Sequence, residues 1–284
     1  MTLPNVDHPL QNRPTEAFPV VQRTGIRFFR RVTNTVGGLF AETGRRGYFL
    51  RDIARAFGDP ATYVPETIRQ MRRIGVDSLP LTVIVAAFIG GVVALQTRYQ
   101  LFPGVELSIV GLATRMVHVL ELGPLLTALV LTGRVGARMT AEIGTMRVTE
   151  QIDALETLAY DPVAFLVVPR LLACLVMLPV LTIFADAVGV YSGYLVGTKV
   201  TAIPSADFIE GLRLGFTPFQ IVYSLLKAFF FGAAIAFNCA YEGYNTTAGA
   251  EGVGRATARA VVITSVVILV IDALTAVVLA PLLQ

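Results

Sequence analysis

The chain has 284 residues, of which 54% are apolar and 15% are charged, and its mean hydropathy is +0.66. Soluble globular domains usually carry about 25% charged residues, so the composition argues against a soluble protein. The formal net charge is +3, and long uncharged runs separate the charged residues. Together these features predict an all-α integral membrane protein.

The N-terminal region is polar and rich in arginine. Residues 1–19 contain four prolines and no periodic pattern, which predicts a disordered cytoplasmic tail. Residues 20–77 alternate apolar residues with arginines, a pattern typical of amphipathic helices that lie on anionic headgroups. Within this region, Pro65–Gly75 is expected to form a short basic helix that leads into the membrane. A nucleic-acid site is the less favoured interpretation of these arginines, because membrane spans follow them.

Five apolar stretches follow, and each is long enough to cross a bilayer. The first, Ser78–Thr97, carries no charge, and about 20 apolar residues in a helix cross a hydrocarbon core of about 30 Å. The stretches after it cover residues 107–133, 164–197, 216–241 and 260–283. The 164–197 stretch is long for one crossing, so it predicts either a tilted helix or a re-entrant pair. A transmembrane domain is therefore expected over residues 78–284.

The distribution of lysine and arginine predicts the orientation of these spans. With the N-terminus in the cytoplasm, residues 1–77, 134–170 and 242–259 are cytoplasmic and hold eighteen of the 23 basic residues, whereas the outer loops hold three. The predicted topology is N-in and C-out. Residues 1–20 lack the apolar core of a signal peptide, and a bacterial inner membrane is the expected location.

Four ionisable residues lie near the middle of predicted spans: Glu121, Asp186, Lys227 and Asp272. A charge at this depth costs about 2.5–3.5 kcal/mol, so each should face protein or water. Lys227 matches Asp272 or Asp186 in depth, which predicts an interhelical ion pair, with a substrate or ion pathway as the alternative. Glu121 has no evident basic partner at its depth and is the stronger functional candidate.

Small residues in the 164–197 stretch indicate helix packing. Gly189, Gly193 and Gly197 recur at four-residue spacing, which lets helix backbones approach closely. Cys174 and Cys239 lie inside apolar segments and are expected to be small buried hydrophobic residues, without a disulfide or a metal.

The longest hydrophilic stretch between spans covers residues 133–162. Its apolar positions fall near helical spacing with acidic residues between them, which predicts a cytoplasmic helix at about 142–160. Its acids have no neighbouring histidine or cysteine, so they are interpreted as a partner-facing surface and not as a metal site. The outer segment 201–217 is expected to contain a short surface helix.

The sequence lacks the usual catalytic motifs. It contains neither H-E-x-x-H nor G-x-x-x-x-G-K-[ST], and its two histidines are His8 and His118. We therefore expect no enzymatic activity and no metal or cofactor in this chain. If ATP drives the protein, ATP and Mg²⁺ should bind to a partner. His118 is interpreted as a polar contact in the core.

Two long blocks, Glu121–Pro162 and Lys227–Thr275, resemble the MlaE/YrbE permease family, and the resemblance extends from about Ala54 to the C-terminus. It implies the permease subunit of an ABC transporter that moves phospholipids or related lipids. It also implies four partners: a second permease chain that forms a homodimer, a cytoplasmic ABC ATPase, an MCE-domain protein and the lipid substrate. An elbow helix at the membrane surface is expected before the five spans.

The resemblance also implies roles for particular residues. A lipid cavity would be lined by Leu95, Gln96, Tyr99 and Glu121. A coupling helix would contact the ATPase through Glu142, Met146, Arg147, Glu150, Asp153 and Glu156. The family often has arginine before the glutamate of E-L-G-P, and Leu120 stands there in this chain, which weakens the expectation of headgroup recognition. An ion-coupled secondary transporter that uses the buried carboxylates is the alternative function, and a membrane-embedded lipid enzyme ranks last.

Overall fold

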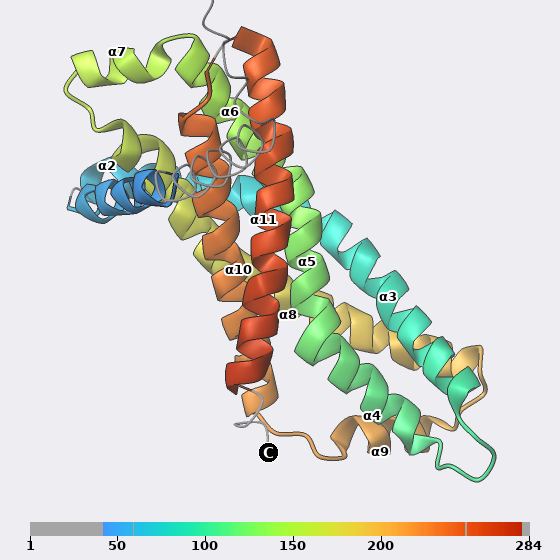
Figure 1. The fold of residues 1–284 in the computed structure, drawn as a ribbon. Coiled ribbons are helices and arrows are strands. Elements are labelled where there is room, and N and C mark those ends of the chain that lie inside the picture. Colours follow the sequence, from blue (N-terminus) through green and yellow to red (C-terminus); the bar gives the residue numbers. More distant parts are fainter. Residues whose placement is uncertain (1–41, 59, 248, 280–284) are drawn as a thin grey trace, which may run out of the picture. The chain divides into compact units, whose positions relative to one another are not determined.

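The computed structural model describes residues 42–58, 60–247 and 249–279, and within these ranges the regular structure is helical without a strand. The predicted all-α fold is therefore confirmed (Figure 1). The chain divides after Leu50 into two units, which are described separately. The predicted tail at 1–19 and the first part of the predicted interfacial region, residues 20–41, lie outside the described residues.

The described N-terminal part is helical and charged. Residues 42–56 form a helix, in which Arg45 and Arg46 approach Glu42 at 2.5 Å and 3.7 Å, one helical turn away. Helix α2, Pro60–Ile74, agrees with the predicted short basic helix. It packs against α8, a helix of the third span.

In the described part of the chain, five helices are long and apolar enough to cross a membrane, as predicted. They extend beyond the predicted stretches at one or both ends, because polar residues continue each helix past its apolar core. Their bounds are Tyr63–Gln100, Ser108–Val148, Val163–Lys199, Phe219–Tyr244 and Gly249–Leu279.

The second span contains two π-turns. It runs through α4 (Ser108–Val117), η2 (His118–Leu122), α5 (Gly123–Leu131), η3 (Thr132–Gly136) and α6 (Ala137–Val148). π-Turns inside α-helices are rare and often occur at functional sites. The turn η2 contains Glu121, the candidate from the sequence.

The third span is one long helix. After the π-turn η4 (Val163–Val167), α8 continues without a break over Val168–Lys199. Of the two expectations for this stretch, the re-entrant pair is therefore wrong. The short helix predicted within residues 201–217 is confirmed as α9, Ser205–Arg213.

The hydrophilic loop differs from the prediction of a single helix at about 142–160. Helix α6 ends at Val148, and α7 covers Gln151–Thr157. Between them, Glu150 has a left-handed backbone with φ of 59°, a conformation that breaks a helix and is unfavourable for a residue with a Cβ. The loop is therefore an elbow of two helices, called the α6–α7 elbow below.

The spans pack through close backbone contacts. Helix α3 (Leu79–Gln100) lies along α8, and α10 (Phe219–Tyr244) packs against both α8 and α11 (Gly249–Leu279) (Figure 1). A Cβ on Gly90 would lie 1.9 Å from the Gly189 carbonyl oxygen, and one on Gly193 would lie 2.5 Å from Thr114. A Cβ on Gly197 would lie 2.8 Å from the Phe208 ring. The three glycines of the third span thus lie where α8 meets its neighbours.

Candidate functional site

Lys227, in the middle of α10, lies between two carboxylates from other spans. Its Nζ is 2.8 Å from Glu121 Oε2 and 2.7 Å from Asp272 Oδ1. It also donates a hydrogen bond of 3.3 Å to the carbonyl oxygen of Leu120. Glu121, Lys227 and Asp272 are called the acid–lysine cluster below.

Three spans position this cluster. Glu121 belongs to η2 of the second span, Lys227 to α10 and Asp272 to α11. Helix α10 packs against η2 and against α11, so both carboxylates reach the same ammonium group. The Lys227 Nζ also lies 5.1 Å from the centre of the Tyr223 ring, a cation–π geometry that favours the charged lysine.

The members of the cluster differ in exposure. The Lys227 side chain is fully buried and that of Asp272 is 11% exposed, whereas that of Glu121 is 43% exposed. An ion inside a membrane protein is tolerated when partners satisfy it. Glu121 is therefore the member of the cluster that a ligand can reach.

The structure corrects two expectations about these charges. Glu121 does have a basic partner, Lys227, because the fold brings η2 against α10. Asp186 does not join Lys227: its Oδ2 accepts a hydrogen bond of 2.9 Å from Ser224, and within the described chain it forms no ion pair. Its Oδ1 lies against α5, where a Cβ on Gly123 would be 1.9 Å away. Of the two partners that depth allowed for Lys227, Asp272 is the one with which it forms an ion pair.

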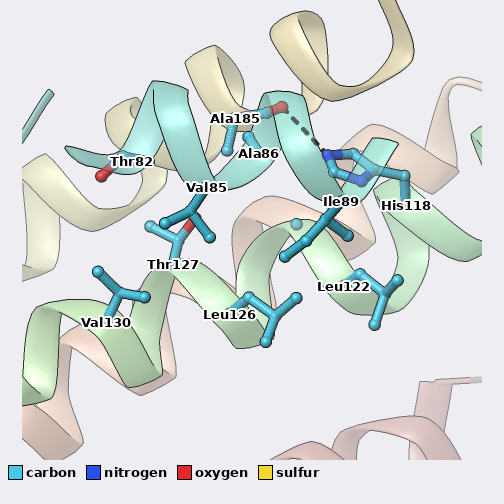
Figure 2. Close-up of a pocket in the computed structure, with 11 residues that line it drawn as sticks. Thr82, Val85, Ala86, Ile89, His118, Leu122, Leu126, Thr127, Val130 and Ala185 are labelled. Carbon is cyan, nitrogen blue, oxygen red and sulfur yellow. Dashed lines mark hydrogen bonds between the residues drawn. The ribbon is translucent and has the colours of Figure 1, made fainter. Parts of the chain in front are cut away.

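The π-turn η2 also contains His118, which contacts α8, whereas Glu121 of the same turn contacts α10. Its Nε2 donates a hydrogen bond of 3.1 Å to the carbonyl oxygen of Ala185 on α8 (Figure 2). The adjoining pocket is lined mainly by apolar side chains such as Val85, Ile89 and Leu126, and it has only about 10 Å³ of space for solvent. That is about the volume needed for one water molecule, so this pocket does not fit a lipid.

The expected lipid-cavity residues on α3 lie at or near the surface. Leu95 is half-buried, Gln96 is exposed, and Tyr99 is 77% exposed. The exposed apolar surface of α3 continues through Ile84 and Phe88, which is 72% exposed. Of the expected cavity residues, Gln96, Tyr99 and the half-exposed Glu121 are therefore accessible to a ligand or to another chain.

The expected ATPase-contact residues are distributed over the α6–α7 elbow. Arg147 of α6 forms an ion pair of 2.7 Å with Asp153 of α7, which ties the two helices together. Glu142 is held by Arg138 at 2.8 Å and by Arg170 at 3.3 Å, so it is not a free surface acid as the sequence suggested. Three acids stay exposed, and Met146 is half-buried. The exposed acids are Glu150, Asp153 and Glu156.

Five membrane-length helices with charged residues gathered inside them define a polytopic helical membrane protein with a polar site between its spans. Comparison with known proteins then identifies the family. The family model described as "Permease MlaE" matches residues 67–278, and the chain belongs to the MlaE permease family.

Several relatives are similar over most of the chain. A probable ABC transporter permease protein of Rickettsia prowazekii is 41% identical over 216 residues, which are 74% of this chain and 82% of the relative. The intermembrane phospholipid transport system permease protein MlaE of Haemophilus influenzae is 33% identical over 250 residues, 87% of this chain and 95% of the relative. The chloroplastic protein TRIGALACTOSYLDIACYLGLYCEROL 1 of Arabidopsis thaliana is 35% identical over 72% of this chain and 59% of the relative.

Proposed function

We propose that this chain is the permease subunit of an ABC transporter that moves phospholipids or related lipids between membranes. Its membership of the MlaE permease family supports the transport role, and the name of the Haemophilus relative supports the phospholipid substrate. One structural observation supports the proposal most directly. The half-exposed carboxylate of Glu121 forms an ion pair with the buried ammonium group of Lys227.

The chemistry of an amphipathic ligand fits this arrangement. The exposed apolar residues of α3, such as Ile84 and Phe88, suit acyl chains, because ligand sites for apolar molecules are mostly apolar with a few placed polar groups. Glu121 supplies a hydrogen-bond acceptor within the spans, where water is scarce. Leu95, Gln96 and Tyr99 would extend the same surface toward the end of α3.

The proposed transporter needs other chains. ATP and Mg²⁺ would bind to an ATPase that docks on the exposed acids of the α6–α7 elbow. A second identical permease chain would cover the exposed face of α3 and Glu121, and an MCE-domain protein would receive or deliver lipid on the other side. The proposed orientation is N-in and C-out in a bacterial inner membrane, where the basic segments face the cytoplasm.

Reconstitution of the permease, ATPase and MCE-domain protein in liposomes tests this function. We expect ATP-dependent transfer of a fluorescent phospholipid, and we expect Glu121→Gln to reduce it about tenfold while the assembly persists, which is the effect of losing one charge-assisted hydrogen bond. Glu210→Gln, an exposed acid on α9, is the matched control and should transfer lipid at the wild-type rate. Transfer that needs neither ATP nor Glu121 would contradict the proposal.

An ion-coupled secondary transporter is the second candidate, favoured by the two carboxylates that share Lys227. This mechanism requires no ATPase. Liposomes that contain the permease alone, under an imposed pH gradient, should therefore show no lipid transfer if the ABC mechanism is correct. Transfer driven by the gradient would favour the secondary transporter.

A further inference from the structure

A groove bounded by α4, α8, α9 and α10 is not used by the proposed function. Its volume is about 590 Å³, within the usual range of about 300–1,000 Å³ for small-molecule sites. Apolar side chains, among them Val119, Val190 and Leu225, make up most of its wall. Two arginines, Arg115 and Arg213, also line it.

The two arginines lie at the same end of the groove. Arg115 of α4 donates a hydrogen bond of 2.8 Å to the carbonyl oxygen of Leu214, the residue next to Arg213 at the end of α9. Arg213 itself is exposed. Positive charge is therefore concentrated where the groove meets the segment between α9 and α10.

Arg115 is buried without a counter-charge. It is only 5% exposed, and its partners are the Leu214 carbonyl, the amide oxygen of Gln220 and the face of the Phe216 ring, 5.4 Å away. Its Nε has no hydrogen-bond partner, and no carboxylate of the described residues forms an ion pair with it. Neutral groups compensate a buried charge only partly, so this site favours an anion.

Among the described residues, one acid lines the groove beside the two arginines. Asp186 lines the wall, but its Oδ2 is bound to Ser224 and its Oδ1 lies against Gly123. Oδ1 has no hydrogen-bond partner among the described residues, and Asp186 forms no ion pair with either arginine there. Two arginines against one acid leave the lining of the groove with a net positive charge.

We propose that this groove binds an anionic phospholipid, with its phosphate between Arg115 and Arg213 and an acyl chain along Val119, Val190 and Leu225. The guanidinium fork matches phosphate oxygens in geometry and charge, and the apolar wall matches a hydrocarbon chain better than it matches a free phosphate ion. This proposal is independent of the proposed transport function, because a lipid that binds permanently and is never transported would fit the same groove.

The test measures lipid retention by the full chain purified in detergent. Native mass spectrometry follows the binding of added dioleoyl-phosphatidylglycerol, which is anionic, and of dioleoyl-phosphatidylcholine, which has no net charge. We expect the wild type to retain about tenfold more of the anionic lipid, the effect of one charge-assisted contact. Arg213→Gln should remove this preference, and Val190→Trp should lower retention of both lipids by filling the groove.

Two matched variants control for general effects. Lys199→Gln removes an exposed basic residue of α8 that does not line the groove, and Val176→Trp adds the same bulk at an exposed position of the same helix. Both should retain lipid as the wild type does. Neither Arg213 nor Val190 is a hydrogen-bond partner of the buried Arg115 side chain. The test therefore needs no substitution of Arg115, which could prevent folding.

The outcomes separate this proposal from its rivals. Equal retention of the two lipids, or anionic-lipid retention unchanged in both Arg213→Gln and Val190→Trp, would overturn it. Competition of inorganic phosphate with the anionic lipid at equal concentration would also overturn it, since the apolar wall would then contribute nothing. Loss of lipid transfer in the liposome assay, with retention intact, would count against the proposed function alone.

Discussion

Two buried cations in this protein, Lys227 and Arg115, have opposite electrostatic environments. Lys227 is enclosed by two carboxylates at 2.8 Å and 2.7 Å, so the protein itself balances its charge. Arg115 is almost as buried, but its partners among the described residues are a carbonyl, an amide and an aromatic ring. The comparison teaches that burial alone does not indicate a charge's role. A cation whose counter-charges lie in the protein links helices, and a cation without them is available to a ligand.

The largest expected effect comes from removing Lys227. Lys227→Met leaves Glu121 and Asp272 as neighbouring acids without a cation, and breaking a buried pair costs about 3–5 kcal/mol. We expect a large loss of folded protein, measured as the monodisperse fraction on size-exclusion chromatography and the thermal-unfolding midpoint in detergent. Adding Glu121→Gln and Asp272→Asn should restore much of the loss. Lys199→Met is the exposed control, and a triple variant no better than Lys227→Met would argue against mutual neutralisation.

Removing Arg115 should cost less. Arg115→Met leaves the Leu214 carbonyl and the Gln220 amide without a donor, which costs about 1–3 kcal/mol, but it leaves no unpaired acid. The unfolding midpoint in detergent should therefore fall less than in Lys227→Met. Added phosphatidylglycerol should raise the midpoint of the wild type and not that of the variant. An equal fall in both variants would break the comparison between the two cations.

The α6–α7 elbow extends the comparison to the surface. Glu142 is enclosed by two arginines, whereas Glu150 and Asp153 are exposed, although Asp153 also pairs with Arg147. Changing both exposed acids to lysine should weaken ATPase recovery in a pull-down about tenfold, a loss of about 1.4 kcal/mol, while membrane insertion is kept. The same double reversal at Asp207 and Glu210 of α9 is the control. Wild-type ATPase recovery together with wild-type lipid transfer would show that the elbow is not the coupling element.

The smallest expected effect is that of a single exposed acid. Glu156→Ala removes one exposed charge with no ion pair in the described residues, and such surface charges contribute about 0–1 kcal/mol. ATPase recovery and lipid transfer should stay within about twofold of the wild type. A tenfold loss would mean that this one carboxylate is buried when the ATPase docks.

The fold was largely predictable because apolar length determines the spans. The five stretches, the basic helix before them and the short helix α9 all appear in the structure. The break at Glu150 was not predictable, because the left-handed backbone occurs at a residue with no glycine-like signal. The ends of the spans were also missed, since polar residues there continue the helices that the apolar cores begin.

The acid–lysine cluster could be predicted only as far as the depth of each residue in its span identifies the ion-pair partners. Equal depth indicated Lys227 and Asp272, but it gave Asp186 as an equal choice and left Glu121 alone. Packing resolved both: Asp186 faces Ser224, and η2 brings Glu121 to Lys227. The role of Arg115 was not predicted, although an arginine inside a predicted span was a usable signal.

The π-turn η2 has a consequence for the angular register of the second span. In a regular α-helix, residues three apart lie about 60° from one another around the axis and share one side. His118 and Glu121 are three apart, yet His118 bonds to α8 and Glu121 to Lys227 on α10. The wider π-turn spreads the two side chains around the axis. One short stretch of helix therefore contacts both α8 and α10. The side-chain positions of α5 are rotated about the helix axis relative to the regular continuation of α4.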